Sequence, residues 1–242
     1  MTVLLADIRQ TLFPVRGSRD GPLPPLLVML TVVTGLVDAF SYLVLGHVFV
    51  ANMTGNVVFL GFALAGAPGF SIGASSTALA AFVVGAFVGG RMGHRLGSNR
   101  GRLLGYATAL QAVPVAGSVA LAAISGGHVA DGARYGLIVM LAVGMGIQNA
   151  AVRRLAVPEL TTTVLTMTMT GIAADGALAG GPGAKAGRRL IAVAAMFLGA
   201  LVGAVCVLHL RIELPLAIAL VVLITVAVTA TLGGRDQSWS TG

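Results

Sequence analysis

The feature that most constrains this chain is a succession of long apolar segments separated by short basic loops. Eight such segments can be drawn, at residues 25–46, 48–67, 73–90, 103–126, 135–152, 160–179, 189–210 and 214–233. A helix needs about 20 mostly apolar residues to cross a bilayer, and six of the eight segments reach or approach that length. The sequence therefore predicts an all-α, polytopic membrane helix bundle.

Composition excludes the other broad classes of protein. Of the 242 residues, 57% are hydrophobic and only 10% are charged, whereas soluble domains average about 25% charged residues. The net charge of +7 does not indicate a nucleic-acid partner, because the arginines lie between apolar segments, where they set membrane orientation. The single cysteine, Cys206, excludes a disulfide framework. No spacing of His, Asp and Glu suggests a metal site, and no cofactor is expected.

The second and sixth segments differ from the others. Residues 48–67 contain the polar motif NMTGN, and residues 160–179 contain six threonines and Asp175. If all eight segments crossed, the loop arginines and lysine would divide 8 to 7 between the two sides. If these two segments return to the side they entered from, the division is 13 to 2, as the positive-inside rule expects with both termini cytoplasmic. We predict six spans plus two re-entrant or broken helices; eight full spans are the alternative.

The chain is expected to comprise three parts. Residues 1–22 form a basic cytoplasmic segment in which we find no cleaved signal peptide. Residues 23–234 form the membrane domain, and residues 235–242 form a cytoplasmic tail.

Two halves of the membrane domain, about residues 23–126 and 134–234, resemble each other. Gly35-Leu-Val-Asp38-Ala39 matches Gly146-Ile-Gln-Asn149-Ala150, and Met53-Thr-Gly55 matches Met169-Thr-Gly171. A third match joins the small-residue runs at 81–89 and 195–203, and the offsets are 111, 116 and 114. Three spans in each half would reverse the second half in the membrane, which gives an inverted repeat.

Polar residues within the apolar segments are the candidates for a solute or ion pathway. Asp38 is the only acid well inside a span, and such a carboxyl can cycle protons, bind a cation or contact a polar solute. The alternative is a neutral acid bonded to a neighbouring helix. We expect backbone breaks at Thr54–Asn56 and Thr170–Gly171 that meet near the bilayer midplane beside Asp38. The predicted pathway residues are Asp38, Asn52, Thr54, Gly55, Asn56, Gln148, Asn149, Thr170 and Gly171.

Glu159 is expected in a surface ion pair near Arg153 and Arg154, or as an acid at a helix N-terminus.

The motifs VDAFSYL, NMTGN and GIQNA, with a threonine-rich segment ending in MTG, resemble the YoaK-like family of bacterial membrane proteins. The resemblance extends over about residues 25–235. It implies an integral protein of the bacterial inner membrane whose function is not established, with small-molecule transport only presumed. It supplies no catalytic or binding residue to carry over.

A transporter or channel for an unknown small solute, with its pathway between the halves, is therefore the leading hypothesis for function. A structural or partner-binding membrane protein is the alternative. An intramembrane enzyme is not expected, because a single acid without a histidine at membrane depth provides no pair of catalytic groups. A homodimer is left open, because six spans are few for building a pathway.

Overall fold

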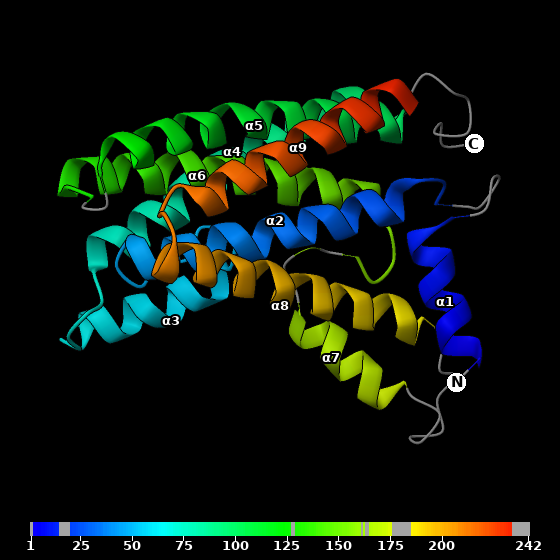
Figure 1. Cartoon of the computed structure of the whole chain (residues 1–242), viewed down its shortest axis with the longest axis horizontal. Coiled ribbons are helices and arrows are strands. Elements are labelled where there is room, and N and C mark those ends of the chain that lie inside the picture. Colours follow the sequence, from blue (N-terminus) through cyan, green and yellow to red (C-terminus); the bar gives the residue numbers. More distant parts are fainter. Residues whose placement is uncertain are drawn as a thin grey trace.

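The computed structural model of the chain describes residues 2–14, 20–126, 129–160, 162, 165–175 and 185–233. The predicted tail at 235–242 lies outside these residues. All the secondary-structure elements of the described part are α-helices (Figure 1). They are α1 (Thr2–Leu12), α2 (Leu23–Val44), α3 (Met53–Leu64), α4 (Ile72–Leu96), α5 (Arg100–Ile124), α6 (Asp131–Leu155), α7 (Leu165–Ala174), α8 (Ala186–His209) and α9 (Leu214–Gly233).

Six of the described helices are long and apolar enough to cross a membrane: α2, α4, α5, α6, α8 and α9. The other two apolar helices, α3 and α7, have 12 and 10 residues and are too short to cross. The prediction of a polytopic bundle with six spans is confirmed. The alternative of eight spans is not supported, because the described residues of the second and sixth apolar segments form only these short helices.

Short polar side chains set the beginnings of the two helices that follow tight loops. The Ser71 hydroxyl accepts a hydrogen bond from the Ala74 amide at 3.2 Å and caps α4. The Asn99 side chain accepts one from the Arg102 amide at 2.8 Å and caps α5. Each cap satisfies an amide that the first turn of a helix leaves without a partner.

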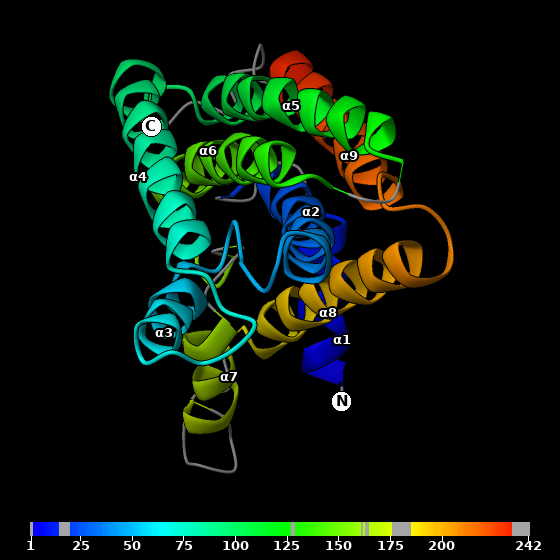
Figure 2. The same ribbon diagram turned by 90° about the vertical axis from the view of Figure 1, so that its left-hand side faces the viewer.

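The helices form two interlocked bundles around a central pair. Viewed along the bundle (Figure 2), α2 and α6 lie in the middle, with α4 and α8 on either side, α5 and α9 on one face, and α3 and α7 on the other. Helix α2 packs mainly on α8 and α9, and α6 packs mainly on α4 and α5. Each bundle therefore combines the first long helix of one half of the chain with the last two helices of the other half. The two bundles meet chiefly where α5 packs on α9.

Glycines allow the main helix pairs to approach until their backbones touch. A methyl group on Gly35 of α2 would collide with the backbone of α8, and one on Gly146 of α6 would collide with the backbone of α4. The reverse contacts are equally close, from Gly199 to Val32 and from Gly85 to Val143. Such close approach through small residues is how membrane helices gain packing energy without a hydrophobic driving force between them.

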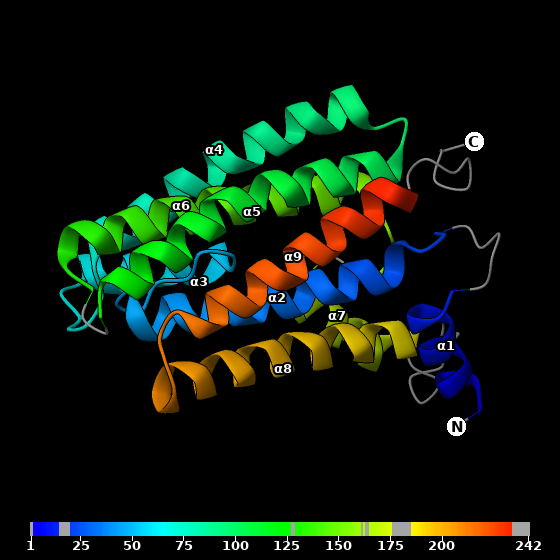
Figure 3. The same ribbon diagram turned by 45° about the horizontal axis from the view of Figure 1, so that its top comes forward.

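The basic residues gather at one end of the bundle, which we name the basic end. Helices α2, α5 and α8 begin there and α4, α6 and α9 finish there (Figure 3), so the basic helix ends and turns at 91–102, 153–154 and 185–189 share that end. Of the described arginines and lysine, only Arg134 and Arg211 lie at the opposite end. The uneven division of charge predicted from the sequence is thus present in the fold.

Helix α1 was not predicted from the sequence, which gave only a basic segment at 1–22. It packs on α8 at the basic end, and Asp7 accepts a hydrogen bond from the Arg188 amide at 3.1 Å. Leu5, Leu12 and Phe13 are exposed. A short amphipathic helix with this arrangement is typical of a segment that lies in the membrane surface.

Candidate functional site

The non-helical linker between α2 and α3, at residues 45–52, is held by Asp38. Asp38 lies on α2 and is buried, and its Oδ1 atom accepts hydrogen bonds from the amides of Val50 at 3.1 Å and Ala51 at 2.9 Å. Non-helical backbone at membrane depth must find such internal partners, because lipid supplies none. The second carboxyl oxygen, Oδ2, is buried and has no hydrogen-bond partner among the described residues. Asp38 therefore has one oxygen committed to the fold and one that is not.

Asn56 pairs with another amide of the same linker, that of Phe49. Its side chain accepts a hydrogen bond from the Phe49 amide at 2.9 Å and donates one to the Phe49 carbonyl at 2.6 Å. Gly55 lies against the Phe49 ring, Asn52 is half-buried, and Thr54 is exposed on the first turn of α3. In the structure, the VDAF and NMTGN motifs thus fix this linker onto α2 and α3.

The two short helices begin near the middle of the bundle and run toward opposite ends. Figure 1 shows α3 starting at mid-length and running away from the basic end, while α7 starts at a similar depth and runs toward it. Figure 2 shows that both lie on the same face of the bundle. A pair of half-length helices from the two halves is therefore present, as the sequence predicted.

The predicted positions of the backbone breaks are wrong. Thr54–Asn56 and Thr170–Gly171 lie within α3 and α7, and the breaks precede both helices. Thr170 is exposed, its hydroxyl donates to the Thr166 carbonyl, and Gly171 lies against the Arg189 guanidinium. The second threonine–glycine motif therefore lies toward the basic end of α7 and does not meet Asp38. A threonine whose hydroxyl bonds back to its own helix removes the need for a break.

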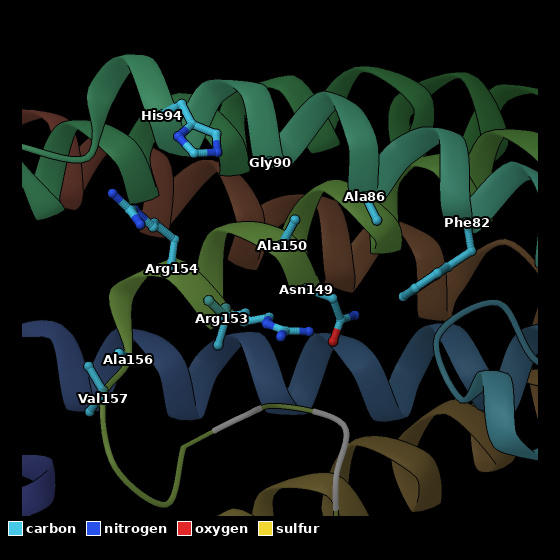
Figure 4. Close-up of a pocket in the computed structure, with 11 residues that line it drawn as sticks. Phe82, Ala86, Gly90, His94, Asn149, Ala150, Arg153, Arg154, Ala156 and Val157 are labelled. Carbon is cyan, nitrogen blue, oxygen red and sulfur yellow. The ribbon is translucent and has the colours of Figure 1, made fainter.

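A groove of about 830 Å³ runs along α4 and α6. Its α4 wall is formed by four residues spaced one turn apart, and its α6 wall includes Asn149 and the basic pair at 153–154 (Figure 4). This volume lies within the range of about 300–1,000 Å³ that small-molecule sites occupy. The lining residues are Phe82, Ala86, Gly90, His94, Asn149, Ala150, Val152, Arg153, Arg154, Ala156 and Val157.

Of the two amides predicted on α6, only Asn149 faces this groove. It is half-buried, and its Nδ2 donates to the Met145 carbonyl at 2.9 Å. Gln148 is buried in the core instead, where its Nε2 donates to the Thr34 hydroxyl at 3.1 Å and its Oε1 accepts from Gln111 at 2.8 Å. These hydrogen bonds connect α2, α6 and α5, so Gln148 joins helices and is not part of the groove.

An ionic cluster anchors α7 at the basic end. The Arg189 guanidinium on α8 donates two hydrogen bonds to Glu159, at 2.7 and 2.9 Å, and contacts Asp175 at 2.8 Å. A smaller cavity of about 460 Å³ lies beside this cluster and α7. The sequence predicts a surface ion pair for Glu159 near Arg153 and Arg154. The ion pair is present, but its partner is Arg189 on α8. The two partners are 30 residues apart, so no local spacing signals the contact.

Glu159 gives this anchor a defined dependence on pH. It lies in the linker after α6, and the hydrogen bonds from Arg189 hold the pKa of its carboxyl below the ordinary value. A lowered pKa stabilises the fold above the unfolded-state value of about 4.3, and that stabilisation is lost as pH falls through the folded-state value. We expect the thermal midpoint of the wild type to exceed that of Glu159→Gln at pH 7, and the difference to vanish as pH falls well below 4. A difference that persists undiminished at acidic pH would contradict this account.

Sequence reasoning missed the groove residues Phe82, His94, Arg153 and Arg154 as members of a site. The arginines had been assigned to topology alone, because a basic pair at the end of a span is the ordinary orientation signal. The spacing of residues 82, 86, 90 and 94, one per turn, is the signal that places them on one face. Within the described residues, no three His, Cys, Asp or Glu side chains come together in a way that could hold a metal ion.

Comparison with known proteins gives two matches. The profile of a family described as "Protein of unknown function (DUF1275)" matches residues 26–229. The "UPF0700 transmembrane protein YoaK" of Bacillus subtilis (strain 168) is 33% identical over 150 residues, which cover 62% of this chain and 65% of that relative. The chain thus aligns with somewhat less than two thirds of the relative's length. No solved structure matches the fold.

Proposed function

The chain belongs to the DUF1275 family of membrane proteins, and we propose that it is a small-solute transporter with its pathway between two inverted halves. The observation that carries the proposal is the groove of about 830 Å³ along α4 and α6. The groove extends from Phe82 toward the basic end, where His94, Arg153 and Arg154 line it, and the half-length helices α3 and α7 begin near the middle of the bundle (Figure 1). Discontinuous helices that meet near the midplane are the usual site of solute binding in transporters built from repeats.

The pattern of helix contacts supports an inverted repeat. Apart from the contacts of α1, exchanging α2 with α6, α3 with α7, α4 with α8 and α5 with α9 converts the set of packed pairs into itself: α4–α6 becomes α8–α2, and α5–α6 becomes α9–α2. Because each half crosses three times, the second half is reversed relative to the first.

The close glycine contacts support the same relation atom by atom. A methyl group on Gly35 would meet Met196, Gly199 and Ala200, and one on Gly146 would meet Phe82, Gly85 and Ala86. Gly146 follows Gly35 by 111 residues, and each of the three residues around Gly35 follows its counterpart around Gly146 by 114 residues. These are two of the offsets found in the sequence.

The two ends of the proposed pathway differ, as an alternating-access carrier requires. By the 111-residue offset, Arg153 in the open groove corresponds to Tyr42 in the first half. There Tyr42 stacks on Phe49, with ring centroids 5.1 Å apart, and both contact Phe59. In the proposal, the open groove is the solute's access from the basic end, and the aromatic cluster closes the other side until the bundles rock about α5 and α9.

Further parts of the proposal follow from the chemistry of the ends and of Asp38. The basic end faces the cytoplasm of a bacterial inner membrane, by the positive-inside rule. The unpartnered Oδ2 of Asp38 carries a proton that is linked to transport. Homodimer formation is tested separately, by measuring the oligomeric state of the protein in a mild detergent.

Single cysteines in a Cys206→Ala background test alternating access. Ala86 lines the groove, and the offset of 114 makes Ala200 its counterpart at the other side; both are half-buried. A membrane-impermeant maleimide should label Ala86→Cys rapidly from the basic end. It should label Ala200→Cys more slowly from the opposite face, because that side opens only in the less populated state.

Leu201→Cys is the matched control, because Leu201 is 46% exposed beside Ala200 on α8 and a thiol facing lipid does not ionise or react. Failure of Ala200→Cys to react from either face would remove the alternating-access proposal.

The second candidate function is a structural or partner-binding membrane protein. The hydrogen bonds of Asp38 Oδ1, Asn56 and Gln148 within the fold favour it, since polar side chains also join membrane helices. In that case the maleimide would label Ala86→Cys from the basic end only, at a single rate, and would not label Ala200→Cys from either face.

A further inference from the structure

We infer that the groove along α4 and α6 binds a small organic anion, one with a carboxylate, phosphate or sulfonate head on an apolar body. The inference rests on the proposed function, because it names the class of solute for the same groove. It is carried by the charge, the contacts and the lining of the groove.

The ionisable groups that line the groove are all basic. They are His94 on α4 and Arg153 and Arg154 on α6, and no acid lines the groove within the described residues. The guanidinium group presents a planar fork of donors that matches the two oxygens of a carboxylate or phosphate.

Three of the described acids near the basic end are engaged with other groups. Asp20 pairs with Arg188 at 2.9 Å and Arg100 at 3.8 Å, and Glu159 and Asp175 pair with Arg189. In the described part of the chain, Arg153 and Arg154 form no ion pair. Among the described residues, no acid pairs with the basic groups of the groove, so we infer a positive potential there, which low-dielectric walls strengthen.

The two arginines are placed to act from different sides of the groove. The stem of Arg154 lies against Gly93 of α4, and its guanidinium lies against Gly97 just after α4; a methyl group on either glycine would come within 3.2 Å of Arg154. Arg153 instead extends along α6 toward Asn149 (Figure 4), away from the membrane surface. An arginine that serves only to fix orientation extends its charged group outward to the headgroups. The inward direction of Arg153 places its charge where a ligand in the groove would lie.

The rest of the lining is apolar and defines the other part of the ligand. Phe82, Ala86, Ala150 and Val157 form walls that present no charge. A groove of about 830 Å³ accommodates an organic molecule and not only an inorganic ion. An anion with an apolar body should therefore bind more tightly than inorganic phosphate.

Anionic lipids offer the same chemistry, so the experiment separates two sources of ligand. Binding of labelled benzenesulfonate and of labelled inorganic phosphate is measured at equilibrium on the full chain in a neutral maltoside detergent. The measurement is repeated in nanodiscs of phosphatidylcholine, with and without phosphatidylglycerol. Benzenesulfonamide, which has the same shape without the charge, serves as the neutral competitor.

We expect saturable binding of benzenesulfonate, weaker binding of phosphate, and no competition by benzenesulfonamide. Arg153→Gln and Arg154→Gln should each weaken binding by roughly tenfold or more, because a hydrogen bond to a charged group contributes about that factor. Arg102→Gln is the matched control. Arg102 belongs to the same end, but its guanidinium lies over the Tyr106 ring at 5.9 Å, outside the groove.

The outcomes separate cleanly. Loss of benzenesulfonate binding in the groove variants, but not in Arg102→Gln, supports a soluble organic anion. Retention of phosphatidylglycerol that is lost in the same variants supports a lipid headgroup as the source. Equal binding by the wild type and an Arg153→Gln, Arg154→Gln double variant, or no binding of either anion or lipid, overturns the inference. Because equilibrium binding needs no transport, a failure here leaves the cysteine-labelling test of the proposed function unaffected, and the reverse also holds.

Discussion

Replacing Gly85 with alanine is expected to remove most of the correctly folded protein. The new methyl group would enter the backbone of α6 at the Val143 carbonyl, and backbone cannot swing aside as a flexible side chain can. Overpacking of a core costs about 1–3 kcal/mol even when side chains adjust, so a collision with backbone should reach or exceed the upper value. Size-exclusion chromatography of a fluorescent fusion, before and after mild heating, measures the loss.

Gly90→Ala on the same helix is the matched control. Nothing lies within 4 Å of the position that its methyl group would take, and alanine is the better helix former by up to about 1 kcal/mol. We expect Gly90→Ala to fold as well as the wild type or better. If Gly85→Ala matched Gly90→Ala in yield and thermal midpoint, the close packing of α4 on α6 would be disproved.

Replacing Asp38 should separate its structural role from its proposed role in proton transfer. Asp38→Ala removes the acceptor for the amides of Val50 and Ala51, and each buried group left unpaired costs about 1–3 kcal/mol. We therefore expect a large fall in thermal midpoint and release of the linker at 45–52. Asp38→Asn keeps an acceptor oxygen at the Oδ1 position, so its midpoint should stay close to that of the wild type.

The same pair of variants tests the link to protons. Benzenesulfonate is a permanent anion, so its uptake by proteoliposomes under an imposed pH gradient reports coupling without leakage of a neutral acid. Asp38→Asn should abolish the gradient-driven part of this uptake, because the amide cannot titrate. Undiminished gradient-driven uptake would remove the proton role, and an Asp38→Asn midpoint as low as that of Asp38→Ala would contradict the structural role.

Much of the architecture could be predicted from the sequence because span length and loop charge are local quantities. Segment lengths and the placement of arginines were enough to predict six spans and to single out the second and sixth segments as different. The short matches at offsets of 111 and 114 lie at the residues where the helices touch, since close packing demands small residues at fixed positions.

The candidate site was harder to predict, because the sequence does not show which polar groups satisfy one another. Asn56 and Gln148 appeared available for a solute, but the structure commits their amides to Phe49, Thr34 and Gln111. The threonines of α7 appeared to mark a break, although a hydroxyl can bond to its own helix. Arg153 was assigned to orientation because a basic pair at the end of a span is the ordinary topology signal, and its direction toward Asn149 is visible only in the fold.

The exchange of helices between the two bundles has a consequence for synthesis of the chain. Helix α2 leaves the ribosome early, but its principal neighbours, α8 and α9, are made last. Until residues 186–233 are inserted, the glycine-rich face of α2 has no permanent neighbour and depends on lipid or on the insertion machinery for cover. Nascent chains that stop after α6 should therefore be recognised as incomplete and degraded, although most of the spans are already present.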